Sequence, residues 1–356
     1  MDFTLTLYRT LLETLQQQGF SFQTFGDFIP AADKRLIILR HDVDLLPLNS
    51  LEFAKIEAEK GIKGTYYFRI VPESFDEKII KEIHSLGHEI GYHYEDLSFA
   101  QAKLKAQGAG HRAQGEELEK QVVEIGIRSF KKNLEDLRKI VPVKTICMHG
   151  SPMSRWDSRL LWKYYDYRDF GIVGEPYFDI NFDEVLYLTD TGRRWDGDSF
   201  NIRDKAEGKW QKAEGMEKKG RKGEGESDRE GDLETKRLSD KEIVEPSVSH
   251  LVHRSFSEGG VPPSDSPSVI LSSPPSALSP QPEFSPAPRT PHPAPFPKFH
   301  STFDIIQAAE DGRLPDKIMM TFHPQRWTDK PIPWMKELVW QNTKNIGKYF
   351  IVKMHS

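Results

Sequence analysis

The chain has 356 residues, a formal net charge of −5 at pH 7 and one cysteine, Cys147. This charge balance gives no reason to expect nucleic acid or an anionic membrane as a partner. A single cysteine excludes an intrachain disulfide, which agrees with a reducing compartment. The first residues, Met1-Asp2-Phe3-Thr4, lack the basic start of a signal peptide, and no apolar run approaches the ~20 residues that span a bilayer. The sequence therefore predicts a soluble, cytoplasmic protein.

The first 200 residues alternate between helical and strand-like patterns. Leu5 to Leu15 repeat at helical spacing, and the apolar run Leu36–Leu39 is typical of a buried strand. Strands that alternate with helices indicate parallel β-structure with helical crossovers. About seven strands favour an α/β fold that closes, or nearly closes, into a barrel. The further predicted strands are 64–68, 89–92, 144–148, 171–174, 185–188 and 317–321, and the further helices are 51–60, 76–86 and 116–140.

The middle of the chain interrupts this order. Residues from about 205 to 241 are rich in charged residues and glycine, and residues 262–297 are rich in serine and proline. Neither stretch can bury enough apolar surface to offset its ordering entropy. The tail after them has one predicted strand and two predicted helices, which are too few to form a hydrophobic core of their own. We therefore expect one discontinuous domain, 1–204 and 298–356, around a disordered insertion at 205–297, in preference to two domains joined by a linker.

Polar side chains follow four of the predicted strands. Functional groups of α/β barrels gather at the C-terminal ends of the strands, so these side chains are expected to converge on one barrel mouth. Imidazoles and carboxylates together are the ligand set of zinc or another first-row divalent ion. The four clusters are His41-Asp42-Val43-Asp44, His93-Tyr94-Glu95-Asp96, His149-Gly150-Ser151-Pro152 and His323-Pro324-Gln325-Arg326-Trp327.

Three stretches resemble the motifs of the NodB-type polysaccharide deacetylases, which are carbohydrate esterase family 4 and its divergent relatives. Arg40–Asp44 stands in the place of the first motif, Gly87–His93 resembles the second, and Phe322–Pro324 resembles the late histidine motif. The resemblance covers about residues 34–204 and 298–330. It implies a distorted (β/α) barrel of about seven strands and a hydrolase that removes an acyl group from an amino sugar or glycan precursor.

The resemblance also implies a role for each matching residue. Asp42 is expected to be the general base and Asp44 a metal ligand, although the spacing Asp-x-Asp, where the family has adjacent aspartates, leaves their division of roles open. His93 is expected to be the first metal histidine, and His323 the general acid. The implied cofactor is a divalent metal ion, zinc in first place.

The chain departs from the family where a second metal histidine usually follows four residues after the first, because Leu97 stands there. His149, at the end of a neighbouring strand, is the favoured replacement, and Asp96 is the rival third ligand. His41 and His88 are expected to have structural roles.

Four residues after the later strands are candidates for substrate binding: Glu175, Arg193, Trp195 and Asp196. Trp195 could stack on a sugar face, or the stretch could be a turn with a half-buried tryptophan and an ion pair. The expected partner is a carbohydrate or a small acylated substrate. Two other functions stay open, a C–N hydrolase acting on a non-sugar amide and a non-catalytic carbohydrate-binding relative. The sequence does not predict the oligomeric state.

Overall fold

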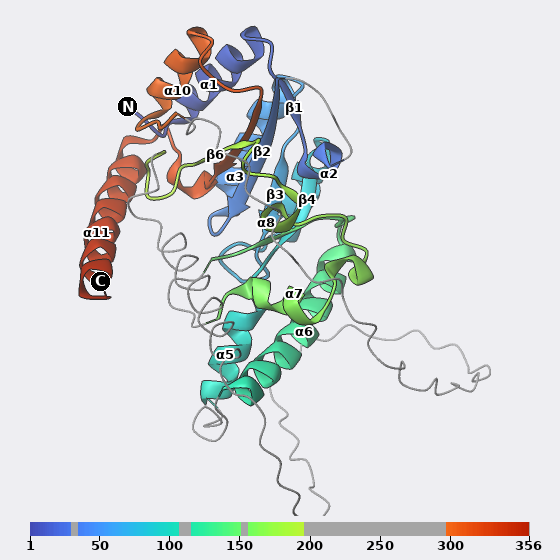
Figure 1. The fold of residues 1–356 in the computed structure, drawn as a ribbon. Helices are drawn as coiled ribbons and strands as arrows, with labels where there is room; N and C mark the ends of the chain where they lie inside the picture. Colours follow the sequence, from blue (N-terminus) through green and yellow to red (C-terminus); the bar gives the residue numbers. More distant parts are fainter. Residues whose placement is uncertain (30–34, 107–114, 151–155, 196–296, 356) are drawn as a thin grey trace, which may run out of the picture. The chain divides into compact units, whose positions relative to one another are not determined.

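The computed structural model describes residues 1–29, 35–106, 115–150, 156–195 and 297–355 (Figure 1). Contacts group residues 1–214 and 291–356 into one compact unit, and the second unit, 215–290, lies outside the described residues. The proposed insertion at 205–297 also lies outside them, apart from Pro297. Its disorder and its boundaries therefore stay predictions.

Seven parallel strands form the centre of the described unit. The sheet has the order β5-β4-β3-β2-β7-β6, and β1 pairs with β2. It curls into a half-barrel, which confirms the predicted α/β class. The strands are β1 (Ser21–Gln23), β2 (Leu36–Val43), β3 (Thr65–Phe68), β4 (Glu89–Tyr94), β5 (Ile146–Met148), β6 (Leu186–Thr189) and β7 (Lys317–Phe322).

Helices connect most of these strands. Asp76 caps α4 by accepting hydrogen bonds from the amides of Lys78 and Ile79, and Gly87 follows the helix with a φ of 93°. Helix α1 packs beside α10, and α5 beside α6 (Figure 1). The helices are α1 (Leu5–Gln17), α2 (Phe25–Phe28), α3 (Pro47–Glu59), α4 (Glu77–Ser85), α5 (Asp96–Ala106), α6 (Glu116–Arg138), α7 (Leu161–Tyr164), α8 (Pro176–Asp179), α10 (Thr302–Glu310) and α11 (Pro331–His355), with 3-10 turns η2 (Ser158–Leu160), η3 (Tyr167–Phe170) and η5 (Pro324–Arg326).

Two apolar clusters lie on opposite faces of β2. Ile38 packs with Tyr67 and Cys147 in a small cluster inside the curl of the sheet. Leu39 belongs to the large cluster under the helices. Because side chains alternate along a strand, Arg40 and Asp42 share the face of Ile38, and His41 shares the face of Leu39. Neighbouring polar residues of one motif therefore enter different environments.

One predicted strand is wrong, and one strand was missed. Residues 171–174 contribute only an isolated bridge between Thr145 and Gly174. Gly171 and Gly174 bracket two apolar residues, and glycines at both ends of so short a run weaken strand pairing. Strand β1 has three residues with Phe22 as its one apolar side chain, which is too little to produce a recognisable pattern.

Candidate metal centre

Asp44, His93 and His149 meet at the C-terminal ends of β2, β4 and β5. Asp44 Oδ1 lies 3.6 Å from His93 Nε2 and 3.5 Å from His149 Nε2. Two ligands bound to zinc at about 2.0–2.2 Å in a tetrahedral arrangement stand about 3.3–3.6 Å apart. These three residues, which we call the metal cluster, could therefore hold an ion with little movement.

Hydrogen bonds orient the first imidazole of the metal cluster. His93 Nδ1 lies 2.9 Å from the carbonyl oxygen of Cys147. A carbonyl only accepts, so Nδ1 donates this hydrogen bond and Nε2 is the ring nitrogen turned towards Asp44. Asp44 Oδ1 is buried and receives no hydrogen bond. An unsatisfied carboxylate oxygen facing two imidazole nitrogens is a place that a cation would satisfy.

The second imidazole is backed by a carboxylate. His149 Nδ1 lies 3.1 Å from Glu95 Oε2. Arg69 holds Glu95 from the other side, donating from Nε at 2.7 Å and from Nη2 at 2.9 Å. Burial opposes the ionisation of Glu95, but His149 and Arg69 outweigh it and lower its pKa to about 2. Among the described residues His149 Nδ1 has no partner with hydrogen-bond geometry, so Glu95 supports this ring as a nearby negative charge.

Asp96, the rival third ligand, is engaged elsewhere. It is fully buried and accepts hydrogen bonds from Tyr92, Ser129 and Asn133 at 2.6–2.9 Å. Burial raises its pKa to about 6. Among the described residues Asp96 joins no group that could hold a metal. The geometry therefore favours His149.

Asp42 lies beside the metal cluster and is paired with an arginine. Arg40 donates to both of its carboxylate oxygens at 2.7 Å, and His93 Nε2 lies 3.7 Å from Asp42 Oδ2. Burial opposes ionisation, but the charge of Arg40 outweighs it and lowers the pKa of Asp42 to about 2. Asp42 is thus ionised at neutral pH. With His93 and Cys147 it forms a second group that could hold a metal, but its oxygens are already occupied by Arg40.

His323 follows β7 and faces the metal cluster. Its Nε2 lies 3.9 Å from Asp44 Oδ2, and its Nδ1 is hydrogen-bonded to the fully buried Asp190. Asp190 also accepts hydrogen bonds from Trp327 Nε1 at 2.6 Å and Arg326 Nη1 at 3.1 Å. Burial opposes its ionisation, but His323 and Arg326 lower its pKa. Asp190 therefore fixes the ring of His323 with Nε2 towards the cluster.

Three residues of this site were not assigned a role from the sequence: Arg69, Glu95 and Asp190. Arg69 and Asp190 directly follow β3 and β6, just as Asp44 directly follows β2. A search for charged residues one position past each strand would have found both. Glu95 belongs to the predicted cluster His93-Tyr94-Glu95-Asp96. Its contact with His149 depends on how the ends of β4 and β5 are placed relative to each other, which the sequence does not indicate.

The candidate substrate residues lie in other surroundings. Glu175 is fully buried and accepts hydrogen bonds from the amides of Met148 and Tyr177. Burial raises its pKa to about 7. These hydrogen bonds cap α8 and hold the end of β5 just before His149. Glu175 makes neither of them to a residue of the metal cluster. Asp196 lies outside the described residues.

Arg193 and Trp195 are packing residues. The Arg193 guanidinium lies over the rings of Phe3 and Trp334 at 5.0 and 4.8 Å from their centroids. Trp195 is only 4% exposed and donates from Nε1 to Thr302 Oγ1 at 3.0 Å. Its ring packs against Phe3, Phe322 and Trp327, so the geometry does not favour stacking on a sugar.

A buried network centred on Glu57 of α3 occupies the helix side of the sheet. Glu57 accepts hydrogen bonds from Tyr8 at 2.5 Å and Tyr66 at 2.9 Å, and His41 Nε2 lies 2.8 Å from its Oε1. His88 lies 3.5 Å from its Oε2 and bridges Gly64 N and Ala54 O. We call these five side chains (Tyr8, His41, Glu57, Tyr66 and His88) the Glu57 network. The structural roles expected for His41 and His88 agree with it.

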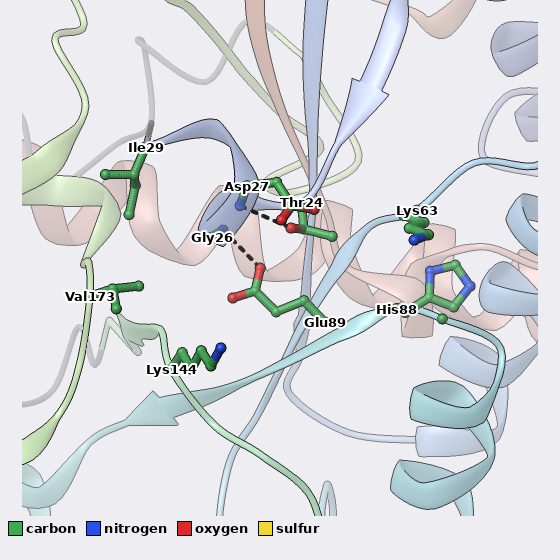
Figure 2. A pocket seen from close by; sticks show the side chains of 10 residues that line it. Thr24, Gly26, Asp27, Ile29, Lys63, His88, Glu89, Lys144 and Val173 are labelled. Atoms are coloured by element: carbon green, nitrogen blue, oxygen red, sulfur yellow. Dashed lines mark hydrogen bonds between the residues drawn. The ribbon is translucent and has the colours of Figure 1, made fainter. Parts of the chain in front are cut away.

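A pocket of about 440 Å³ lies at the other ends of the strands (Figure 2). Its half-buried carboxylate, Glu89, begins β4, whereas His93 stands near the end of that strand. Glu89 accepts hydrogen bonds from Gly26 N at 3.0 Å, Thr65 Oγ1 at 2.8 Å and Thr145 Oγ1 at 2.7 Å. Both oxygens are satisfied within the protein. This pocket is therefore separate from the metal cluster.

No family model, curated protein or solved structure matches the chain. In the part of the chain that the structure describes, none of the helices has both the length and the apolar character needed to cross a membrane. An assignment of function therefore depends on the residues of the site.

Proposed function

We propose that the chain is a metal-dependent hydrolase that removes an acyl group from an amino sugar or glycan precursor. One observation carries this proposal: Asp44, His93 and His149 offer three ligand atoms to one ion, beside an ionised Asp42 and an oriented His323. Zinc held there would supply a Lewis acid and a water with a pKa of roughly 7.

The residues around the metal cluster have complementary tasks in this proposal. Asp42, ionised and held by Arg40, takes a proton from the water that attacks the acyl carbonyl. His323 gives a proton from Nε2 to the departing amine as the C–N bond breaks, which leaves a carboxylic acid and a free amine. Asp190 supports this transfer because its hydrogen bond to Nδ1 keeps the ring in one orientation.

Metal analysis of the full chain tests the proposal. We expect about one zinc per chain in the wild type, loss of most of it in His149→Ala, and retention in Asp96→Ala and in the exposed control His84→Ala. Retention of zinc by His149→Ala would contradict the proposed ligand set.

Activity is measured on N-acetylated amino sugars as acetate release before and after chelation. Release that survives chelation and His93→Ala would contradict the metal-dependent mechanism. Release from non-sugar amides alone would favour the other C–N hydrolase, and glycan binding without metal or acetate release would favour the non-catalytic relative. The cytoplasmic location and the lack of a nucleic-acid partner stay predictions.

A further inference from the structure

Gln325 of η5 contacts the metal cluster through its side chain. Its Nε2 donates to Asp44 Oδ2 at 3.2 Å. A carboxylate only accepts hydrogen bonds, so this contact places the NH2 group of the carboxamide towards Asp44. The carboxamide oxygen, Oε1, is buried and accepts no hydrogen bond within the part of the chain that the structure describes. Among these residues, the hydrogen bond to Asp44 is what orients the carboxamide.

The buried oxygen of Gln325 lowers the stability of the fold. An acceptor that leaves water without gaining a new partner is unfavourable, and native proteins contain few such atoms. An apolar side chain of similar length, such as methionine, would avoid this cost. Packing alone therefore does not explain a glutamine at this position, and its contact with Asp44 does.

The two aspartates at the end of β2 are held by different donors. Arg40 donates to both carboxylate oxygens of Asp42, whereas Gln325 donates to Oδ2 of Asp44. Oδ1 of Asp44 is left facing the two imidazoles of the metal cluster. A neutral amide also leaves the negative charge of Asp44 available to a cation, whereas the positive charge of an arginine repels one.

Gln325 also stands between Asp44 and His323. Both side chains face the same oxygen, Asp44 Oδ2, which lies 3.2 Å from Gln325 Nε2 and 3.9 Å from His323 Nε2. The first distance is a hydrogen bond, and the second is beyond hydrogen-bond range. Without the amide, the carboxylate would be free to turn towards the imidazole, because a charged acceptor strengthens such a hydrogen bond. The amide therefore occupies the position on Oδ2 that His323 would otherwise take.

The main chain holds both partners of this hydrogen bond in place. Asn49 Nδ2 lies 3.3 and 3.4 Å from two carbonyl oxygens that bracket Gln325 in the chain. Arg69 Nη1 donates to Asp44 O at 3.1 Å. The contact thus forms before an ion binds, so that little conformational freedom is lost on binding.

We propose, on the basis of the proposed function, that Gln325 is a positioning residue for the metal. It holds Asp44 with Oδ1 towards the ion and keeps this carboxylate apart from His323, the acid of the proposed reaction. The division of roles between Asp42 and Asp44 then follows from their donors. An arginine holds the base, and a neutral amide holds the ligand.

The zinc Kd of the full chain, measured by competition with a chromophoric chelator, tests this inference. Gln325→Met keeps the length of the side chain and removes its hydrogen bond, so the Kd should rise by about 10–100-fold. The Tm of the metal-free chain should stay equal or rise, because the substitution also removes the unpartnered Oε1. The control is Gln341→Met on α11, where a buried glutamine donates from Nε2 to Glu337 at 2.6 Å. This control should leave the zinc Kd unchanged.

A zinc Kd of Gln325→Met within about twofold of the wild type, or an equal rise in Gln341→Met, would overturn the inference and leave the proposed function standing. A raised Kd with a lower Tm of the metal-free chain would also overturn it, because the loss would reflect a damaged fold. Zinc binding that depends on Gln325 without acetate release would support the positioning role and contradict the hydrolase. Failure of the wild type to bind zinc would contradict both.

Discussion

The metal cluster and the Glu57 network use the same kinds of side chain on opposite faces of β2. Glu57 receives hydrogen bonds from two tyrosines and a contact of 2.8 Å from His41. Asp44 Oδ1 is buried but receives no hydrogen bond, and it faces two ring nitrogens. The two groups therefore differ at the carboxylate. Both oxygens of Glu57 accept a hydrogen bond, whereas Asp44 Oδ1 accepts none from the described residues.

The largest effect is expected in the Glu57 network. Glu57→Ala leaves Tyr8, His41 and Tyr66 buried without their common partner, so the free energy of unfolding should fall by about 3–5 kcal/mol. Urea denaturation measures this change. Glu59→Ala on the same helix removes an exposed carboxylate and should change stability by less than about 0.5 kcal/mol. Equal effects of the two substitutions would show that the network does not stabilise the fold.

The next effect concerns the orientation of His323. Asp190→Asn removes the carboxylate that is hydrogen-bonded to His323 Nδ1, so kcat should fall by about 100-fold. Steady-state kinetics on an N-acetylated amino sugar measures this loss, with the exposed Asp183→Asn as the control. A kcat within about twofold of the wild type would remove His323 from the proposed chemistry.

Substitution of Glu95 tests whether the carboxylate beside His149 contributes to zinc affinity more than the neighbouring buried carboxylate of Asp96. Glu95→Gln weakens the support of His149, and we expect the zinc Kd to rise by about 10–100-fold. Competition with a chromophoric chelator measures this Kd. Asp96→Asn changes the adjacent carboxyl, which contacts Tyr92, Ser129 and Asn133 instead, and it should leave the Kd unchanged. A raised zinc Kd in Asp96→Asn with an unchanged Kd in Glu95→Gln would show that Asp96, and not Glu95, supports zinc binding.

The smallest expected effect is that of Glu175 on the free energy of unfolding, and this effect depends on pH. Burial raises its pKa from 4.5 to about 7, so the folded chain holds this proton more tightly than the unfolded chain. Its stabilising contribution is full below about pH 4.5 and is lost as the pH rises through about 7. From about pH 5 to about pH 8 the wild type should therefore lose about 1–3 kcal/mol more stability than Glu175→Gln.

Denaturant titrations of both proteins across this range measure the difference. The exposed Asp183→Asn should follow the wild type at every pH. A wild type whose stability rises relative to Glu175→Gln over the same range would show that Glu175 is stabilised in its charged form.

The sequence was sufficient for the fold class, and it named the three residues that the structure brings close enough to hold an ion. Apolar runs mark the strands, and polar residues just past them mark the barrel mouth, so Asp44, His93 and His149 were identified together. The side-chain environments were harder to predict. Trp195 and Arg193 follow a strand as site residues do, but contacts with Phe3, Thr302 and Trp334 bury them. Such contacts join distant parts of the chain and leave no local pattern.

The position of β7 between β2 and β6 has a consequence for biosynthesis. Asp44, His93 and His149 have all been translated by the time the ribosome reaches β6, whereas His323 comes much later. Until β7 emerges, one edge of β2 has no partner and presents unpaired backbone groups that can capture another chain. A nascent chain halted before β7 therefore carries Asp44, His93 and His149 without His323 and without the strand that pairs with this edge of β2. The free edge is the part of the sheet most exposed to wrong pairing until synthesis of β7 is complete.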